Sequence, residues 1–226
     1  MDILHRDDLT EGGFAGLREY RLVTGHKTFG TRRDSATFDG IGNFVYLADA
    51  RFNPRGETGL HPHREVDVIS IVLEGRISHE GSLEHGQQLQ AGDVQVQRAG
   101  GEGFSHNEVN PDNARNRMLQ LWVLPERAGE AAGYKTYRPD ADKVCRIYGG
   151  EQGQQATFDS HTFIDVVEMN AGQLYRSDKN LLAYVSIGQG LANGEIVTEG
   201  SLIRSDGLEL RAGEKMQLIV ITADAQ

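Results

Sequence analysis

Short apolar runs separated by glycines make up most of the chain. Two of them alternate strictly, with valines against glutamines over residues 94–97 and leucines against charged residues over 208–211. Because successive side chains of a strand point to opposite faces, a period of two predicts β-strands. We predict strands at 43–50, 66–73, 76–79, 94–98, 118–124, 162–169, 181–187, 194–197, 201–204, 208–211 and 216–222.

Helical signals are weak by comparison. No long segment keeps a period of 3.6 residues, and short helical turns are expected only within 125–133, where Pro125 could start one and Gly133 end it. The chain has 28 glycines and 5 prolines, which is the punctuation of strands and tight turns. The predicted fold class is therefore all-β.

The pattern also repeats. The segment 72–77 resembles 185–190, and 96–102 resembles 210–214, so the two copies lie about 114 residues apart. Two β-barrel or jelly-roll domains in tandem would give this repeat. The boundary is expected within 125–139, which is rich in Gly, Pro and charge, and we assign residues 1–130 to one domain and 131–226 to the other.

Composition narrows the classes of partner. The formal net charge is −10, and no cluster of Lys and Arg is present, which argues against binding to nucleic acid or to an anionic membrane surface. No apolar stretch reaches the ~18 residues that span a bilayer, and the acidic start does not resemble a signal peptide. Cys145 stands alone and predicts a strand thiol rather than a disulfide. We expect a cytoplasmic protein.

The candidate metal ligands form two pairs, and the members of each pair stand two residues apart in the sequence. His61 and His63 precede the strand predicted at 66–73, and His106 and Glu108 repeat the spacing downstream. Residues i and i+2 of an extended segment project to the same side, so each pair could offer two ligands to one ion. The first pair alone is a weak signal, but the second pair makes coincidence much less probable.

The residue types indicate the kind of metal. Three imidazoles and one carboxylate suit a single divalent first-row ion, such as Fe, Mn, Co, Ni, Cu or Zn, and not a cysteine-rich structural zinc site. Four protein ligands on a six-coordinate ion leave two positions open, and open positions imply chemistry.

These motifs carry a resemblance to a known family. Residues 59–65, 72–75, 91–95, 99–108 and 118–125 together resemble the pirin family of the cupin superfamily. The resemblance implies a bicupin with metal in the N-terminal barrel alone, held by His61, His63, His106 and Glu108. Asp67 stands where relatives commonly have glutamate, a position that other cupins use as a ligand, so Asp67 is a reserve candidate.

The repeat offers a check on the second domain. Offsets of about 114 residues place His61 and His63 opposite Tyr175 and Ser177, and His106 and Glu108 opposite Ile219 and Ile221. None of these four residues is a histidine or a carboxylate, so the second copy is expected to lack a metal site.

The resemblance also implies an activity. Proteins of this kind resemble quercetin 2,3-dioxygenases, in which a metal, here expected to be Fe(II), acts as Lewis acid and template while O2 opens a flavonol ring and carbon monoxide is released. Glu108 would accept the proton of the flavonol 3-hydroxyl as a general base. Two alternatives stay open: a non-enzymatic pirin-type regulator that binds proteins in a metal-dependent way, and a cupin isomerase.

The remaining aromatic and imidazole side chains are expected to be structural or solvated. Trp122 and Phe104 are predicted to belong to the core, and His26 to a loop. Solvated positions are predicted for His5, His79, His85 and His161.

Overall fold

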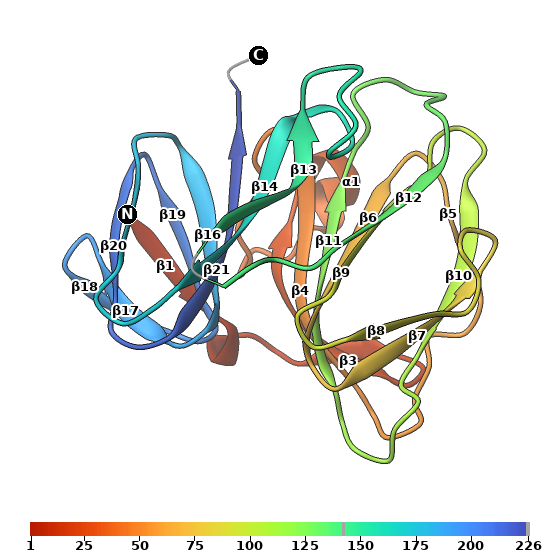
Figure 1. The fold of residues 1–226 in the computed structure, drawn as a ribbon, viewed down its shortest axis with the longest axis horizontal. Coiled ribbons are helices and arrows are strands. Elements are labelled where there is room, and N and C mark those ends of the chain that lie inside the picture. Colours follow the sequence, from red (N-terminus) through yellow and green to blue (C-terminus); the bar gives the residue numbers. More distant parts are fainter. Residues whose placement is uncertain (142, 225–226) are drawn as a thin grey trace. The chain divides into compact units, whose positions relative to one another are not determined.

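The computed structural model describes residues 1–141 and 143–224, and in them it is an all-β protein (Figure 1). These residues form 21 strands, the short helix α1 (His26–Phe29) and two 3-10 turns, Arg6–Asp8 and Gly30–Arg32. Every strand predicted from alternation is present, with ends shifted by at most about two residues, as is usual for element boundaries. No helix of the described part is long and apolar enough to cross a membrane.

The chain divides into two compact units. One is Leu9–Arg138, and the other joins Met1–Asp8 to Pro139–Gln226. These limits differ from the expected division at 130/131 because two edge strands pair with partners distant in sequence. The strand β12 (Gly133–Tyr137) pairs with β9 (Val94–Arg98), and β1 (Asp2–His5) pairs with β19 (Ser201–Ser205). In place of the helical turn expected within 125–133, residues 126–129 form a bend and a single turn, and the chain then enters β12.

The unit Leu9–Arg138 contains two sheets. One has the order β12-β9-β6-β11-β4-β3-β2 and the other the order β5-β10-β7-β8. Besides β9 and β12, its strands are β2 (Gly12–Phe14), β3 (Leu17–Thr24), β4 (Phe44–Phe52), β5 (His61–His63), β6 (Asp67–Glu74), β7 (Arg76–Gly81), β8 (Gln87–Gln90), β10 (Phe104–Val109) and β11 (Arg117–Val123).

The second unit also contains two sheets, ordered β1-β19-β16-β21-β14-β13 and β15-β20-β17-β18. Besides β1 and β19, its strands are β13 (Val144–Gly150), β14 (Ser160–Met169), β15 (Leu174–Ser177), β16 (Leu181–Ile187), β17 (Gln189–Ala192), β18 (Glu195–Thr198), β20 (Leu208–Ala212) and β21 (Met216–Ala223).

The two units repeat one topology, as the spacing of the sequence motifs predicts. The order β9-β6-β11-β4 matches β19-β16-β21-β14, and β5-β10-β7-β8 matches β15-β20-β17-β18. The fold is thus a bicupin. The detailed alignment expected from sequence needs a correction, because Ile219 and Ile221 lie on β21, the counterpart of β11. The counterpart of β10 is β20, where Leu210 stands opposite Ala192 as Glu108 stands opposite His79.

The interiors of the two units differ in polarity. The second unit is filled by one continuous apolar cluster that includes Ala192, Leu208 and Leu210. In the first unit, the corresponding strands bury His79, His106 and Glu108 instead. Because a small barrel fills its interior with side chains, polar residues at these positions are costly unless they are paired or bind a ligand. The polar interior therefore marks the first unit as the candidate site for a bound ligand.

Candidate metal centre

Two neighbouring strands present the histidines. The strands β5 and β10 pair antiparallel, with His106 opposite His61 and Phe104 opposite His63, and they lie side by side in Figure 1. Their close approach requires Gly103, which has φ +76° and where a Cβ would lie 2.6 Å from the carbonyl oxygen of His63. The glycine-rich turn before β10 thus places the second pair of residues beside the first.

The three imidazoles converge through their Nε2 atoms. The Nε2 of His106 lies 3.1 Å from the Nε2 of His63 and 3.1 Å from that of His61. All three ligand atoms lie within 4.8 Å of one another. Two nitrogens bound to one ion at about 2.1 Å stand about 3.0 to 3.4 Å apart for octahedral to tetrahedral angles. The two spacings of 3.1 Å therefore fit a single first-row metal ion.

The protonation states of the rings suit metal binding. His61 Nδ1 lies 2.9 Å from the carbonyl oxygen of Gly59, which can only accept, so the proton is on Nδ1 and the Nε2 lone pair is free. Burial lowers the pKa of His63 to about 4, and that of His106 to about 2, with the neighbouring imidazoles adding to the effect. The rings of His63 and His106 are thus neutral near pH 7. A cation among their lone pairs would relieve the close contact of three electron-rich atoms.

Glu108 is buried in the same interior but is held by other residues. Its Oε1 accepts hydrogen bonds from the Ser70 hydroxyl at 2.7 Å and from Gln95 Nε2 at 2.8 Å. Its Oε2 accepts only a longer bond of 3.3 Å, from Gln120 Nε2. The carboxylate is not in the group of mutually close ligand atoms, which contains the three histidines. The structure thus brings three of the four expected ligands together and leaves the fourth outside this group.

The environment of Glu108 favours a proton acceptor. Complete burial raises the pKa of its carboxyl group, and the hydrogen bond from Ser70 and the nearby imidazoles of His79 and His61 act in the opposite direction. A carboxylate with a raised pKa takes up a proton more readily than an exposed one.

Comparisons with known proteins identify the family of the chain. A family model described as "Pirin" matches residues 26–123. A protein of Pseudomonas aeruginosa named "Putative quercetin 2,3-dioxygenase" is 34% identical over 161 residues, which cover 67% of each chain. The chain belongs to the pirin family. A Zymomonas mobilis protein with the same kind of name is 26% identical over 191 residues, 79% of this chain and 81% of its own.

A solved structure supports the fold of this pirin. The bacterial pirin YhhW of Escherichia coli, in complex with nickel(II), superposes with a TM-score of 0.84 over 100% of this chain and 99% of its own, at 17% sequence identity. At that identity, the likeness concerns the fold.

Aromatic side chains surround the histidines of this pirin. Trp122 packs edge-on to His63, with ring centroids 5.9 Å apart, and Tyr46 stacks on Trp122 at 4.3 Å. Phe29 lies nearly parallel to Trp122, at 6.5 Å and 7°. Phe104, predicted to be core, is buried and contacts both His63 and His106. Trp122 was also predicted to belong to the core, but it is only partly buried and packs against the buried cluster that contains Phe104.

A second apolar feature lies beside His61. Phe14 packs edge-on to the His61 ring with centroids 6.2 Å apart, and it is 45% exposed. Leu60, which precedes His61 in the sequence, is 72% exposed. Large exposed apolar side chains next to a polar site are typical of a binding surface for an apolar ligand.

His79 was expected to be solvated, and this prediction is wrong. It is fully buried, 5.5 Å from the His106 ring, and its Nε2 lies 2.8 Å from the carbonyl oxygen of Leu83. The sequence carried a usable signal, because His79 shares its strand face with Ile77, which is also buried. Alternation showed that the two share a face, but not that this face lines the interior.

Asp67, the reserve ligand, serves a different purpose. Its buried carboxylate pairs with Arg98, whose Nε lies 3.1 Å from Oδ2, and Arg98 also pairs with Glu130 at 3.0 Å. It is not a member of the histidine group.

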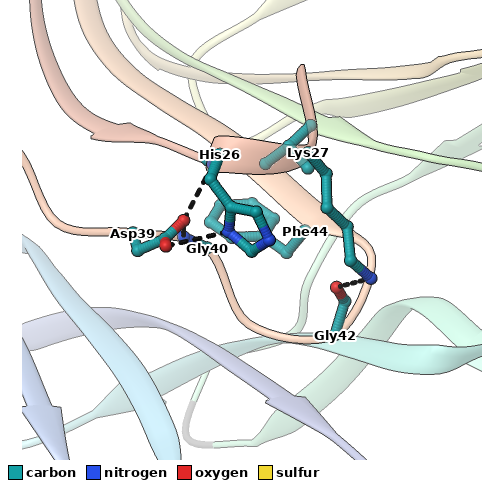
Figure 2. Close-up of a pocket in the computed structure, with 8 residues that line it drawn as sticks. His26, Lys27, Asp39, Gly40, Gly42 and Phe44 are labelled. Carbon is teal, nitrogen blue, oxygen red and sulfur yellow. Dashed lines mark hydrogen bonds and ion pairs between the residues drawn. The ribbon is translucent and has the colours of Figure 1, made fainter. Parts of the chain in front are cut away.

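The other histidines lie outside that group as well. His85 and His161 are exposed, and His5 is half-buried with its Nε2 3.0 Å from the Glu199 carbonyl oxygen. Figure 2 shows the exposed His26 at the start of α1, its ring turned toward Asp39 with Nδ1 2.9 Å from Oδ2.

Proposed function

We propose that this pirin is a metal-dependent dioxygenase that cleaves a quercetin-like flavonol with O2 and releases carbon monoxide. The observation that carries the proposal is the convergence of three imidazoles, within a polar barrel interior that also holds Glu108. The name shared by relatives from two organisms supports the choice of substrate.

Four residues of this chain have separate roles in the proposed reaction. His61, His63 and His106 would hold one ion, proposed to be Fe(II), with Glu108 as the fourth ligand. The bound ion would act as Lewis acid and as template for the two substrates. Glu108, which is fully buried, accepts the proton of the flavonol 3-hydroxyl. His61 and His63 are partly exposed, so the centre can be reached from outside.

The aromatic surroundings favour a planar, apolar substrate. Phe29, Tyr46 and Trp122 lie within 24° of parallel to one another beside His63, and Phe14 borders His61. Aromatic rings bind one another by offset stacking and edge contacts, each worth about 0.5–1.5 kcal/mol beyond the area buried. A flavonol would present its rings to these side chains while its hydroxyl and carbonyl oxygens face the histidines.

The proposal is tested by elemental analysis followed by an assay. Freshly purified protein should contain one first-row ion per chain, and the metal-replete protein should consume a flavonol under air and release an equal amount of carbon monoxide. The same assay under nitrogen should show no release. If metal-replete protein consumes no flavonol, the dioxygenase proposal fails, and a metal-dependent regulatory module becomes the better interpretation.

Phe14→Ala should weaken flavonol binding without removing metal. Loss of one edge contact predicts a flavonol dissociation constant about 2- to 10-fold higher, measured anaerobically by fluorescence quenching. Because Phe14 is 45% exposed, the fold should tolerate the change. Ile196→Ala, at an apolar residue that is 76% exposed in the other unit, is the matched control and should bind flavonol as the wild type does. Equal affinity of the two variants would refute a role for Phe14.

A further inference from the structure

We infer that Ser70 and Gln95, with Gln95 oriented by Tyr134, are positioning residues that anchor one oxygen of Glu108 and leave the other for the metal and the substrate proton. The inference rests on the proposed function in that it gives Glu108 a task at the metal. It adds three residues to which neither the sequence motifs nor the family resemblance assigns a role.

The two carboxylate oxygens of Glu108 differ in the number and length of the hydrogen bonds that they accept. Oε1 receives two short bonds, from the Ser70 hydroxyl and from Gln95 Nε2, whereas Oε2 receives one bond of 3.3 Å from Gln120. Gln95 Nε2 also lies 3.2 Å from the Ser70 hydroxyl oxygen, which ties the two donors together. Oε1 is therefore saturated, and Oε2 keeps the free lone pairs. Only Oε2 can take a further partner without losing a short hydrogen bond.

Tyr134 supports the orientation of the Gln95 amide. Its hydroxyl donates to Gln95 Oε1 at 3.1 Å, and burial raises the pKa of Tyr134 to about 12, so the phenol keeps its proton near pH 7. With Oε1 accepting from Tyr134, the amide must turn its Nε2 donor toward Glu108. A flipped amide would set its oxygen against the carboxylate and lose the hydrogen bond to Glu108. Tyr134 thus acts on Glu108 through Gln95.

The second unit supplies an internal comparison. Ser70 stands opposite both Gln95 and Gln120 in the ladders of β6, and its counterpart Ala183 stands opposite Ile203 and Val220. With Leu210 as the counterpart of Glu108, the four polar positions of the first barrel are all apolar in the second. Those four counterparts, Ala183, Ile203, Leu210 and Val220, belong to one buried core cluster.

This comparison shows that the fold does not need the polar residues. The same strand order packs with an apolar interior in the second unit, so the polar set in the first is not a requirement of the barrel. Buried polar networks cost stability unless every member is satisfied, and here the members converge on one carboxylate beside three imidazoles. Their shared feature is Glu108, which points to positioning of that side chain as their role.

The test uses the full chain loaded with Co(II), whose visible spectrum responds to its ligands. The variants are Tyr134→Phe, Gln95→Met, the double variant, and Glu108→Gln. Tyr20→Phe, which removes a hydroxyl from β3 of the same unit, is the matched control. The measured quantities are the Co(II) dissociation constant by chelator competition, the Co(II) spectrum, and the thermal midpoint of the metal-free protein.

Partners that orient metal ligands typically contribute 10- to 100-fold in affinity. We expect Gln95→Met to raise the Co(II) dissociation constant by about that factor and to shift the spectrum toward that of Glu108→Gln. Tyr134→Phe should raise the constant about 2- to 10-fold, as loss of one neutral hydrogen bond predicts. In the Gln95→Met background, Tyr134→Phe should have no further effect, because its partner is gone. Tyr20→Phe should bind Co(II) as the wild type does.

Two results would overturn the inference: unchanged affinity and spectrum in Gln95→Met, or an undiminished effect of Tyr134→Phe in the Gln95→Met background. A merely structural role would lower the thermal midpoint and leave the spectrum of the bound Co(II) unchanged. Failure of the proposed function is distinguishable, because Co(II) binding is measured without turnover. A wild type that binds Co(II) but consumes no flavonol would refute the dioxygenase proposal alone, and a wild type that binds no Co(II) would refute both.

Discussion

His63→Ala should abolish stoichiometric metal binding while leaving the fold intact. The substitution removes one of three converging Nε2 atoms, so the remaining imidazoles keep only two of the nitrogen ligands. Loss of a direct ligand should exceed the 10- to 100-fold cost of losing a residue that merely orients one, so we expect more than about a 100-fold loss of affinity. His63 suits the test better than His106, because His63 is partly exposed and His106 is fully buried.

Elemental analysis after dialysis measures this effect. The wild type should retain one ion per chain, and His63→Ala close to none. His161→Ala, at an exposed histidine of the other unit, serves as the control and should retain the full amount. Full occupancy in His63→Ala, or two ions per wild-type chain, would exclude the proposed site. Circular dichroism should show the same strand content in all three proteins.

Glu108→Gln should lower the rate of carbon monoxide release by about a hundredfold to ten-thousandfold, the usual contribution of a general base. The amide keeps the size of the side chain and an oxygen that can still accept from Ser70 and Gln95. It cannot take up a proton at neutral pH and carries no charge to attract a cation. The variant should therefore retain part of the metal and still bind flavonol, but turn over slowly.

The measurement must separate chemistry from metal loss. Carbon monoxide release should be expressed per bound ion, and flavonol affinity should be measured anaerobically on the same preparations. Turnover per ion equal to that of the wild type would rule out a base role for Glu108. A loss explained entirely by missing metal would leave Glu108 as a ligand and nothing more.

The alternation of residues along the chain predicted many of the strands. It also predicted that the three histidines belong to one site. Side chains at i and i+2 of a strand share a face, and this geometry was enough to group His61 with His63 and His106 with Glu108. The same periodicity located the strands from 43–50 to 216–222 within about two residues. The repeat predicted the two barrels, although it matched the second pair of residues to β21 instead of β20.

Strand pairing and the polarity of the interior could not be predicted in this way. The sequence places Tyr134 beyond the expected boundary at 130, but β12 pairs with β9 and brings it to Gln95. Likewise, the glutamines of β9 look like a solvent face, yet Gln95 is fully buried and bonded to Glu108.

The sequence by itself thus determined which side chains share a face, and from this the strands, the repeat and the paired ligand spacings. Only the tertiary structure decided which faces line the first barrel, so that His79, Gln95 and Ser70 meet Glu108 and the imidazoles there. The physical reason is that alternation is set by neighbouring residues along one strand. Whether a face meets water or the interior depends on hydrogen bonds between strands far apart in the chain.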